Sequence, residues 1–371
     1  MKYYIIAGEA SGDLHGSNLI KQLQIKDSAA NIKCWGGDLM QSKGATLVRH
    51  YQELAFMGFA EVVKNLPTIF KNLSFCKKDI LEFNPDVLVL IDYPGFNLRI
   101  AKWAKQQNIK VAYYISPQVW AWKANRVKQM KLDIDKMICI LPFEKDYYKK
   151  QWNWDVEYVG HPLTEVIKAF QLTNNEIQNS KFKIQNCIAI LPGSRKQEIS
   201  KKLPIMLSVA KHFSTYHFVV AKAPGIDDEF YNEYLKAYPN VSSVSNQTYQ
   251  LLSNSVAAIV TSGTATLETA LFAVPEIVCY KANNISYQIG KRVVKIKFIS
   301  LVNLIMDKLV VKELIQYELT TENITKELND LLYKEERKEQ LNKDYQQLWN
   351  ILYTDGSPSE KAANIIYNMI K

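Results

Sequence analysis

Two sets of short, uniformly apolar runs recur along the chain, and they constrain its fold more than any other feature of the sequence. In the first half the runs cover residues 3–7, 87–91, 111–115 and 137–141. In the second half they cover residues 187–191, 218–221, 256–260 and 277–280. Runs that are apolar throughout, rather than alternating, are typical of parallel strands covered on both faces.

The segments between the runs are predicted to be helical. Ile69, Leu73, Cys76, Ile80 and Phe83 recur at helical spacing and form one apolar stripe. Strands that alternate with amphipathic helices predict an α/β fold built from doubly wound parallel sheets.

The length of 371 residues fits two domains that each bury a core of their own. The strand pattern restarts after Gly160-His161-Pro162. We therefore expect a first domain at 1–163 and a second at 164–345, with the polar stretch 164–186 as the linker. A helical segment follows at 346–371, in which Ser357 is the expected N-cap, and its apolar stripe predicts packing on the first domain or on a second copy.

The composition argues against several classes of protein. With 47% apolar residues, 14 Gly and 12 Pro, the chain is neither disordered nor collagen-like. Its longest charge-free stretch, Ala237 to Leu267, is rich in hydroxyl and amide side chains, so no transmembrane helix is expected. No signal peptide is evident, and the five widely spaced cysteines favour reduced thiols. We therefore expect a cytoplasmic protein.

The net charge of +9 is compatible with nucleic acid, an anionic membrane surface or acidic substrates as partners. Between Lys281 and Lys297 there are five basic residues and no acidic one, which predicts a positive patch or simply a solvated surface. No array of aromatic and basic residues suggests a nucleic-acid binder.

A glycine-rich segment follows the first strand. Its glycines do not have the GxGxxG spacing of a dinucleotide site, which leaves a loop that opens a helix and offers free amides to an anion or a sugar hydroxyl. A tight strand-to-helix turn is the alternative. The candidate substrate-binding residues are Gly8, Glu9, Ser11, Gly12 and Asp13.

Two further candidates follow the next strands of the first half. Asp92 follows the run 87–91, where apolar surroundings can raise the pKa of a carboxyl group. It is therefore the candidate base. The alternative is that Asp92 only caps the next helix. Trp120, in the segment 116–122, offers a flat face to a sugar or a lipid, although it could equally belong to the core.

Two anion cradles are predicted in the second half. The first follows a strand and consists of Gly193, Ser194 and Arg195. Ser194 and Gln197 have capping-box spacing, so a helix is expected to begin here. Its N-terminus and the Arg195 guanidinium would then bind a diphosphate. The second cradle also follows a strand, and Leu267 and Leu271 of the helix after it are expected to face inward. The alternative is a helix cap that binds no ligand. Its polar residues are Ser262, Gly263, Thr264 and Glu268.

No metal site is expected. The five histidines lack HExxH spacing, and Asp133 with Asp135 precedes a strand and is better explained as helix surface.

Taken together, these motifs give the chain a resemblance to the lipid-A-disaccharide synthase family. In chain order they are GEASGD at 8–13, LAFMGFAEV at 54–62, PDVLVLID at 85–92, PGFN at 94–97, SPQVWAW at 116–122, LPFE at 141–144, GHPL at 160–163, LPGSR at 191–195, SGTATLE at 262–268, SLVN at 300–303 and ELIQ at 313–316. Each string alone is weak, but their shared order over nearly the whole chain is specific.

The resemblance implies a GT-B architecture, in which two Rossmann-like doubly wound domains face each other across a cleft. It implies transfer of diacylglucosamine from UDP-2,3-diacylglucosamine to 2,3-diacylglucosamine 1-phosphate (lipid X), with inversion and without a metal or other cofactor. Asp92 would deprotonate the acceptor 6-hydroxyl and Arg195 would hold phosphate charge. The residues implied around UDP are Gly193, Ser194, Ser262, Gly263, Thr264, Glu268, Asn303 and Gln316.

Because both implied substrates are acylated, the resemblance also implies peripheral contact with the cytoplasmic face of the inner membrane. Met57, in the apolar cluster 56–59 beside Lys64 and Lys71, is the candidate for that contact, although a core segment is nearly as compatible. His15 is a second possible base. Either a monomer or a homodimer is compatible with the sequence.

Two competing functions remain open at this point. One is another GT-B enzyme that acts on UDP-GlcNAc, either a 2-epimerase or a peptidoglycan transferase. The other is a non-catalytic UDP-sugar-binding membrane adaptor, in which Asp92 would only cap a helix.

Overall fold

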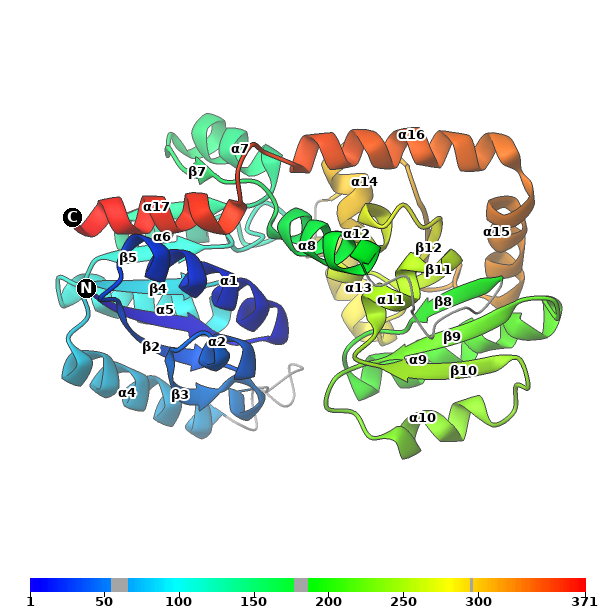
Figure 1. Cartoon of the computed structure of the whole chain (residues 1–371), viewed down its shortest axis with the longest axis horizontal. Helices are drawn as coiled ribbons and strands as arrows, with labels where there is room; N and C mark the ends of the chain where they lie inside the picture. Colours follow the sequence, from blue (N-terminus) through cyan, green and yellow to red (C-terminus); the bar gives the residue numbers. More distant parts are fainter. Residues whose placement is uncertain (55–65, 177–185, 294–295) are drawn as a thin grey trace. The chain divides into compact units, whose positions relative to one another are not determined.

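The computed structural model describes residues 1–54, 66–176, 186–293 and 296–371 (Figure 1). Its contacts divide the chain into two compact units. The first is Met1–Pro162 with Tyr353–Lys371, and the second is Leu163–Leu352. The second unit extends past the predicted residue 345, because helix α16 continues to Leu352.

The first unit contains a parallel sheet of seven strands in the order β3-β2-β1-β4-β5-β6-β7. The strands are β1 (Lys2–Ala7), β2 (Asn31–Gly36), β3 (Thr46–His50), β4 (Val87–Ile91), β5 (Val111–Tyr114), β6 (Lys136–Cys139) and β7 (Glu157–Tyr158). The helices are α1 (Ala10–Lys26), α2 (Asp38–Ser42), η1 (Tyr51–Leu54), α4 (Leu66–Phe83), α5 (Pro94–Gln106), α6 (Arg126–Asp133), α7 (Pro142–Trp152) and α17 (Pro358–Ile370).

Alternate residues of the central strands face opposite layers of helices. Tyr4 and Ile6 of β1 face a core that α4 to α7 complete, and the predicted stripe of α4 lies in or against that core. The opposite face is covered by α1, against which α17 packs (Figure 1). Ser357 accepts a hydrogen bond from the Glu360 amide, so the predicted N-cap of α17 is confirmed.

The second unit contains a parallel sheet of six strands in the order β10-β9-β8-β11-β12-β13. The strands are β8 (Cys187–Leu191), β9 (His217–Lys222), β10 (Val241–Ser245), β11 (Ser255–Thr261), β12 (Glu276–Tyr280) and β13 (Lys312–Ile315). The helices are α8 (Pro162–Glu176, which begins at the unit boundary), α9 (Lys196–Ser208), η2 (Val209–His212), α10 (Asp228–Leu235), α11 (Thr248–Ser253), α12 (Thr264–Leu271), α13 (Asn284–Val293), α14 (Leu301–Met306), α15 (Thr321–Tyr333) and α16 (Glu335–Leu352).

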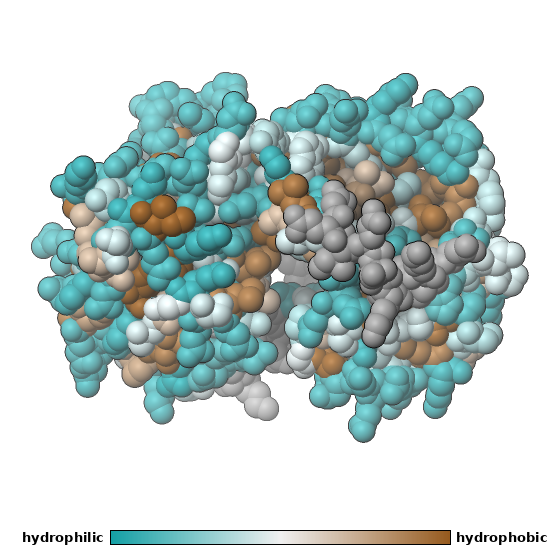
Figure 2. Space-filling view, viewed as in Figure 1, coloured by the Kyte–Doolittle hydropathy of each residue, from teal (hydrophilic) through white to brown (hydrophobic). Residues whose placement is uncertain are grey.

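Helices also cover both faces of this second sheet. One face packs on α11 and α12, while α15 contacts β11 and β12 as well as α9. Helix α16 is amphipathic: Leu341, Tyr345 and Leu348 are buried, and the surface over this helix is hydrophilic in Figure 2. The predicted linker is wrong over its first part, because residues up to Glu176 belong to helix α8.

The strand order of each unit identifies where a ligand is expected. In both sheets the chain first builds strands to one side and then crosses to the other, so a switch point lies between β1 and β4 and another between β8 and β11. In doubly wound folds, ligands bind beyond the carboxyl ends of the strands at such a point.

Candidate functional site

The switch point of the first unit carries Glu9 after β1 and Asp92 after β4. Asp92 and Tyr93 are both left-handed, with φ of 44° and 50°. Non-glycine residues adopt this conformation at a cost in energy, and such residues cluster at functional sites.

Three hydrogen bonds hold the main chain of Asp92 in this position. Its amide donates to the Tyr114 carbonyl over 3.1 Å. Its carbonyl accepts from Tyr113 Oη at 2.5 Å and from Asn97 Nδ2 at 2.8 Å. The neighbouring strand and the helix after Asp92 therefore hold its main chain.

The surroundings of Asp92 give its carboxyl group a pKa that suits a general base. Burial, and secondarily the negative charge of Glu9, raise the pKa of Asp92 to about 7. A carboxylate with a pKa near the working pH is ionised often enough to take a proton and basic enough to do so efficiently.

The predicted glycine-rich loop is shorter in the structure than expected. Helix α1 begins at Ala10, so Ser11, Gly12 and Asp13 lie in its first turn, and Glu9 is its N-cap without a side-chain capping bond. Gly8 lies directly against Tyr93, where an added Cβ would be 2.4 Å from the ring. Ser11 is exposed, whereas Gly12 packs on Ala7.

Asp13, a predicted substrate-binding residue, forms hydrogen bonds within the first unit. Its carboxylate is buried and accepts hydrogen bonds from the amides of Gly37, Leu39 and Met40, at 2.8, 3.1 and 3.0 Å. Gly37 is the N-cap of α2. Asp13 therefore caps a neighbouring helix, and its acceptor positions are largely used.

Trp120 is fixed by a residue for which no role was predicted from the sequence. The indole Nε1 donates to Glu144 Oε1 at 3.2 Å, while Glu144 Oε2 accepts from the Leu141 amide at 3.1 Å. Burial raises the pKa of Glu144 to about 8. The LPFE string contained this clue, because Glu stands at the N3 position of a helix that begins with Pro142.

His15, the second possible base, is buried, and its Nδ1 has no hydrogen-bond partner in the described part of the chain. Burial lowers the pKa of His15 to about 4. Burial, with a smaller effect of His15, lowers the pKa of His161 to about 3. Two neutral imidazoles thus lie near each other on the α1 side of the unit.

At the switch point of the second unit, Gly193 is left-handed with φ of 116°. A Cβ there would lie 3.3 Å from Glu198 Oε2, 3.5 Å from Thr261 Cγ2 and 3.6 Å from Lys202 Nζ. The predicted capping box is wrong by one residue, because Arg195, not Ser194, is the N-cap of α9 and makes no side-chain capping bond. Ser194 itself is exposed.

Glu198 links two cations beneath this loop. Its Oε1 is 3.0 Å from Arg195 Nη1, and its Oε2 is 3.6 Å from Lys202 Nζ. Arg195 is 45% exposed at its side chain, but Lys202 is only 3% exposed, and burial lowers the pKa of Lys202. Lys202 carried no sequence signal, since a lysine in the second turn of a helix is ordinarily a surface residue.

The second predicted cradle also follows a strand. Gly263 has φ of 152° and nothing within 4 Å of an added Cβ, and the exposed Thr264 begins α12. The buried Thr261 Oγ1 has no hydrogen-bond partner among the described residues. Ser262 Oγ, in contrast, donates to the Ile299 carbonyl at 2.9 Å.

Glu268 lies one turn into α12 and accepts a 2.9 Å hydrogen bond from Tyr249 Oη. Burial raises the pKa of Glu268. The prediction that Leu267 and Leu271 face inward is confirmed, because both are buried.

The side chains of Asn303 and Gln316, which the resemblance places around UDP, form hydrogen bonds within the second unit. Asn303 is fully buried, where Nδ2 donates to the Val311 carbonyl and to Glu313, and Oδ1 accepts two main-chain amides. Gln316 bonds through Oε1 and Nε2 to both main-chain groups of Ala282. Both side chains therefore hold loops beside β13, which the local strings could not reveal.

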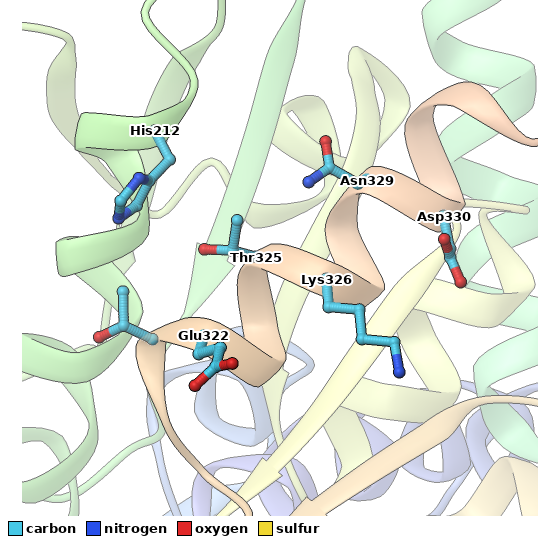
Figure 3. Close-up of a pocket in the computed structure, with 7 residues that line it drawn as sticks. His212, Glu322, Thr325, Lys326, Asn329 and Asp330 are labelled. Atoms are coloured by element: carbon cyan, nitrogen blue, oxygen red, sulfur yellow. The ribbon is translucent and has the colours of Figure 1, made fainter.

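Met57 and the cluster 56–59 lie outside the described residues. A shallow pocket lies between η2 and α15, and none of the predicted site residues lines it (Figure 3). Its lining residues are His212, Thr321, Glu322, Thr325, Lys326, Asn329 and Asp330.

Solved structures with the same fold include UDP-GlcNAc 2-epimerase from Methanocaldococcus jannaschii in complex with UDP-GlcNAc and UDP. It has a TM-score of 0.67 and 14% identity, covering 99% of this chain and 100% of that one. CalG4, the calicheamicin glycosyltransferase, has a TM-score of 0.61 and 14% identity, covering 99% and 98%. The predicted GT-B architecture of two parallel α/β sheets is therefore confirmed.

Sequence relatives are much closer. Lipid-A-disaccharide synthase of Syntrophus aciditrophicus is 36% identical over 374 residues, covering 99% of this chain and 97% of that protein. The enzyme of the same name from Trichlorobacter lovleyi is 37% identical, covering 88% and 87%. The model of the lipid-A-disaccharide synthetase family matches residues 3–365. The chain therefore belongs to the lipid-A-disaccharide synthetase family and is a glycosyltransferase of lipid A biosynthesis.

Proposed function

We propose that this enzyme transfers 2,3-diacylglucosamine from UDP-2,3-diacylglucosamine to the 6-hydroxyl of 2,3-diacylglucosamine 1-phosphate. The products would be the β-1,6-linked disaccharide 1-phosphate and UDP, with inversion at the anomeric carbon. The observation that carries this proposal is the position of Asp92 and Arg195, each at the switch point of its own parallel sheet.

In the proposed mechanism Asp92 is the only group that must accept a proton. Its ionised carboxylate takes the proton of the acceptor hydroxyl as that oxygen attacks the anomeric carbon and the bond to UDP breaks. A single in-line displacement inverts the configuration and needs no covalent intermediate. The pKa of about 7 supports this role, since the carboxyl group releases its proton at neutral pH.

The leaving UDP would be held in the second unit. Arg195 stands at the N-terminus of α9, and α12 begins beside Gly263, so two positive helix ends and a guanidinium would meet the diphosphate. The unpartnered Thr261 hydroxyl and the exposed Thr264 are further donors. Solved relatives of this fold are described as bound to UDP or UDP-GlcNAc, which supports a UDP-sugar donor here.

We propose that the transfer needs no metal ion, because these cations and amides would balance the charge that develops on UDP. We further propose peripheral contact with the cytoplasmic leaflet of the inner membrane, where acylated substrates reside. In the described part of the chain no helix is long and apolar enough to cross a bilayer.

Product analysis tests the proposal against its main competitor. Purified enzyme is incubated with lipid X and either UDP-2,3-diacylglucosamine or UDP-GlcNAc, with and without EDTA, and the products are identified by mass spectrometry and NMR. We expect one UDP and one β-linked disaccharide 1-phosphate per turnover from the acylated donor only, unaffected by EDTA. Epimerisation or transfer of UDP-GlcNAc, with no reaction of the acylated donor, would overturn the proposal.

A further inference from the structure

An exposed tryptophan with two cations beside it lies in the loop after β5. The side chain of Trp122 is 47% exposed. Lys123 Nζ lies 4.2 Å from its ring centroid, and the guanidinium carbon of Arg126 lies 5.9 Å away. These three residues are called the Trp122 cluster below.

The two cations of the cluster have no acidic partner within the described ranges. Lys105, Lys149 and Lys150 of the same unit, in contrast, each pair with an aspartate. Burial, and then the charge of Arg126, lower the pKa of Lys123. An anion bound between the two side chains would offset their mutual repulsion.

The cluster lies at the same sheet edge as Asp92. Strands β4 and β5 are neighbours in parallel register, Asp92 follows β4, and the loop that carries Trp122 follows β5. Tyr113, whose hydroxyl donates to the Asp92 carbonyl, experiences the charges of both Asp92 and Arg126. Tyr113 therefore lies within electrostatic reach of both the candidate base and the cluster.

Acidic groups also lie on this edge. Burial raises the pKa of Asp92 to about 7 and that of Glu144 to about 8, which reduces the negative charge of these two groups at neutral pH. The other acidic groups that follow strands here are Glu9, Asp13, Asp38 and Glu53.

The loop that carries the cluster is held in one conformation. Ser116 is hydrogen-bonded to Tyr148 at 2.7 Å, and Trp120 is hydrogen-bonded to Glu144 at 3.2 Å. Lys123 is left-handed with φ of 57°, and its carbonyl accepts the Arg126 amide at 3.0 Å. A site that is already ordered binds its ligand with little loss of conformational entropy.

We propose that Lys123 and Arg126 bind the phosphate monoester of the acceptor sugar, with the exposed ring of Trp122 packed against the sugar. Arg offers two parallel donors to a phosphate and Lys adds a compact charge. This inference rests on the proposed function and deepens it, since it names the residues that select a phosphorylated acceptor over an unphosphorylated one.

The decisive experiment is kinetic. Lys123→Met with Arg126→Met is compared with wild type and with Lys128→Met, which removes an exposed charge from the same helix. We expect the double variant to raise KM for lipid X by about 10- to 100-fold, about tenfold for each charge-assisted contact that is lost. KM for the UDP-sugar should not change, and 2,3-diacylglucosamine without its phosphate should become as good an acceptor as lipid X. Lys123→Arg alone, which keeps the positive charge, should keep the wild-type preference for lipid X over the unphosphorylated sugar.

A binding measurement separates this inference from the proposed function. Glucosamine 1-phosphate is titrated into each protein while tryptophan fluorescence is followed, with Trp122→Phe to identify the signal. We expect a response in wild type and Lys128→Met that is lost in the double variant. If the enzyme fails to make disaccharide but this pattern holds, the transfer proposal fails and the phosphate site stands.

Two results would overturn the phosphate site. One is an unchanged fluorescence titration, or an unchanged acceptor preference, in a double variant whose circular dichroism and Tm match wild type. The other is a double variant that loses binding to phosphatidylglycerol vesicles while its KM for lipid X in detergent micelles stays at the wild-type value. That second result would assign the cluster to the membrane surface instead.

Discussion

The ring of Tyr93 occupies the space that a side chain at position 8 would need. A Cβ added to Gly8 would lie 2.4 Å from Cγ and from Cδ1 of Tyr93. Tyr93 follows Asp92, and both residues are left-handed. The residue after β1 and the turn after β4 therefore pack closely against each other beside the candidate base.

Gly8→Ala should consequently disturb both stability and catalysis. Overpacking of this kind costs about 1–3 kcal/mol. Gly95→Ala is the matched control, because nothing lies within 4 Å of its added Cβ. Thermal unfolding should show a lower Tm for Gly8→Ala, unchanged Tm for Gly95→Ala, and recovery when Tyr93→Ala is added to Gly8→Ala. Equal stability of the two alanine variants would contradict this packing.

Glu9→Gln should move the pH dependence of the reaction. The negative charge of Glu9 helps to raise the pKa of Asp92, so its removal makes ionised Asp92 easier to form. The acid limb of kcat/KM, expected near pH 7 in wild type, should shift to lower pH. A limb that stays in place, whatever happens to KM, would show that Glu9 does not act on the titrating group.

Lys202→Met should weaken UDP binding without unfolding the protein. With Lys202 gone, Glu198 would hold Arg195 alone, and Arg195 would be less available to a phosphate. We expect about a tenfold loss of UDP affinity in calorimetric titration, or about 1.4 kcal/mol. The methionine keeps most of the buried stem, and the partly exposed Glu198 keeps Arg195 as its partner, so Tm should change little.

The neighbouring exposed lysine supplies the control for that change. Lys201→Met removes the same charge at the surface of α9 and should bind UDP as wild type does. Equal UDP affinity in Lys202→Met, Lys201→Met and wild type would show that Lys202 does not contribute to UDP binding.

Asp92→Asn should stabilise the fold, and more so at higher pH. The pKa of folded Asp92 lies above its ordinary value, so between pH 3.8 and about 7 the folded state holds a proton that the unfolded state has lost. Stability of wild type therefore falls as pH rises through that window, by at most about 1.4 kcal/mol per pH unit for this one group. Tm measured at pH 5 and pH 8 should show the larger gain for Asp92→Asn at pH 8.

Much of the fold could be predicted because the central strands are uniformly apolar. The runs 87–91 and 187–191 coincide with β4 and β8. The strands that were missed carry mixed patterns, such as the serine-rich β10 at one edge of its sheet and the lysine-containing β2. β10 is an edge strand and only partly buried, whereas β2 lies between β3 and β1 but carries Asn31 and Lys33 among its apolar residues.

Candidate site residues could be predicted from the sequence only where they lie close to a recognisable strand. Asp92 directly follows the apolar strand β4, and Arg195 ends the short loop after the apolar strand β8, so the switch-point rule gives their positions. Asn303 was predicted beside UDP, and its side chain bonds to Val311, just before β13, and to Glu313 within β13. Hydrogen bonds of this kind between a helix and the next strand leave no trace in the spacing of residues.

The measurement that tests the account most directly is the rate of disaccharide 1-phosphate formation by wild type and Asp92→Asn between pH 5.5 and 9, with UDP affinity measured in parallel. For wild type we predict a rate that rises to a plateau through about pH 7. For Asp92→Asn we predict a rate about 10²- to 10⁴-fold lower with no such limb and unchanged UDP affinity. A variant that keeps the limb and the rate of wild type would contradict the assignment of Asp92 as the base.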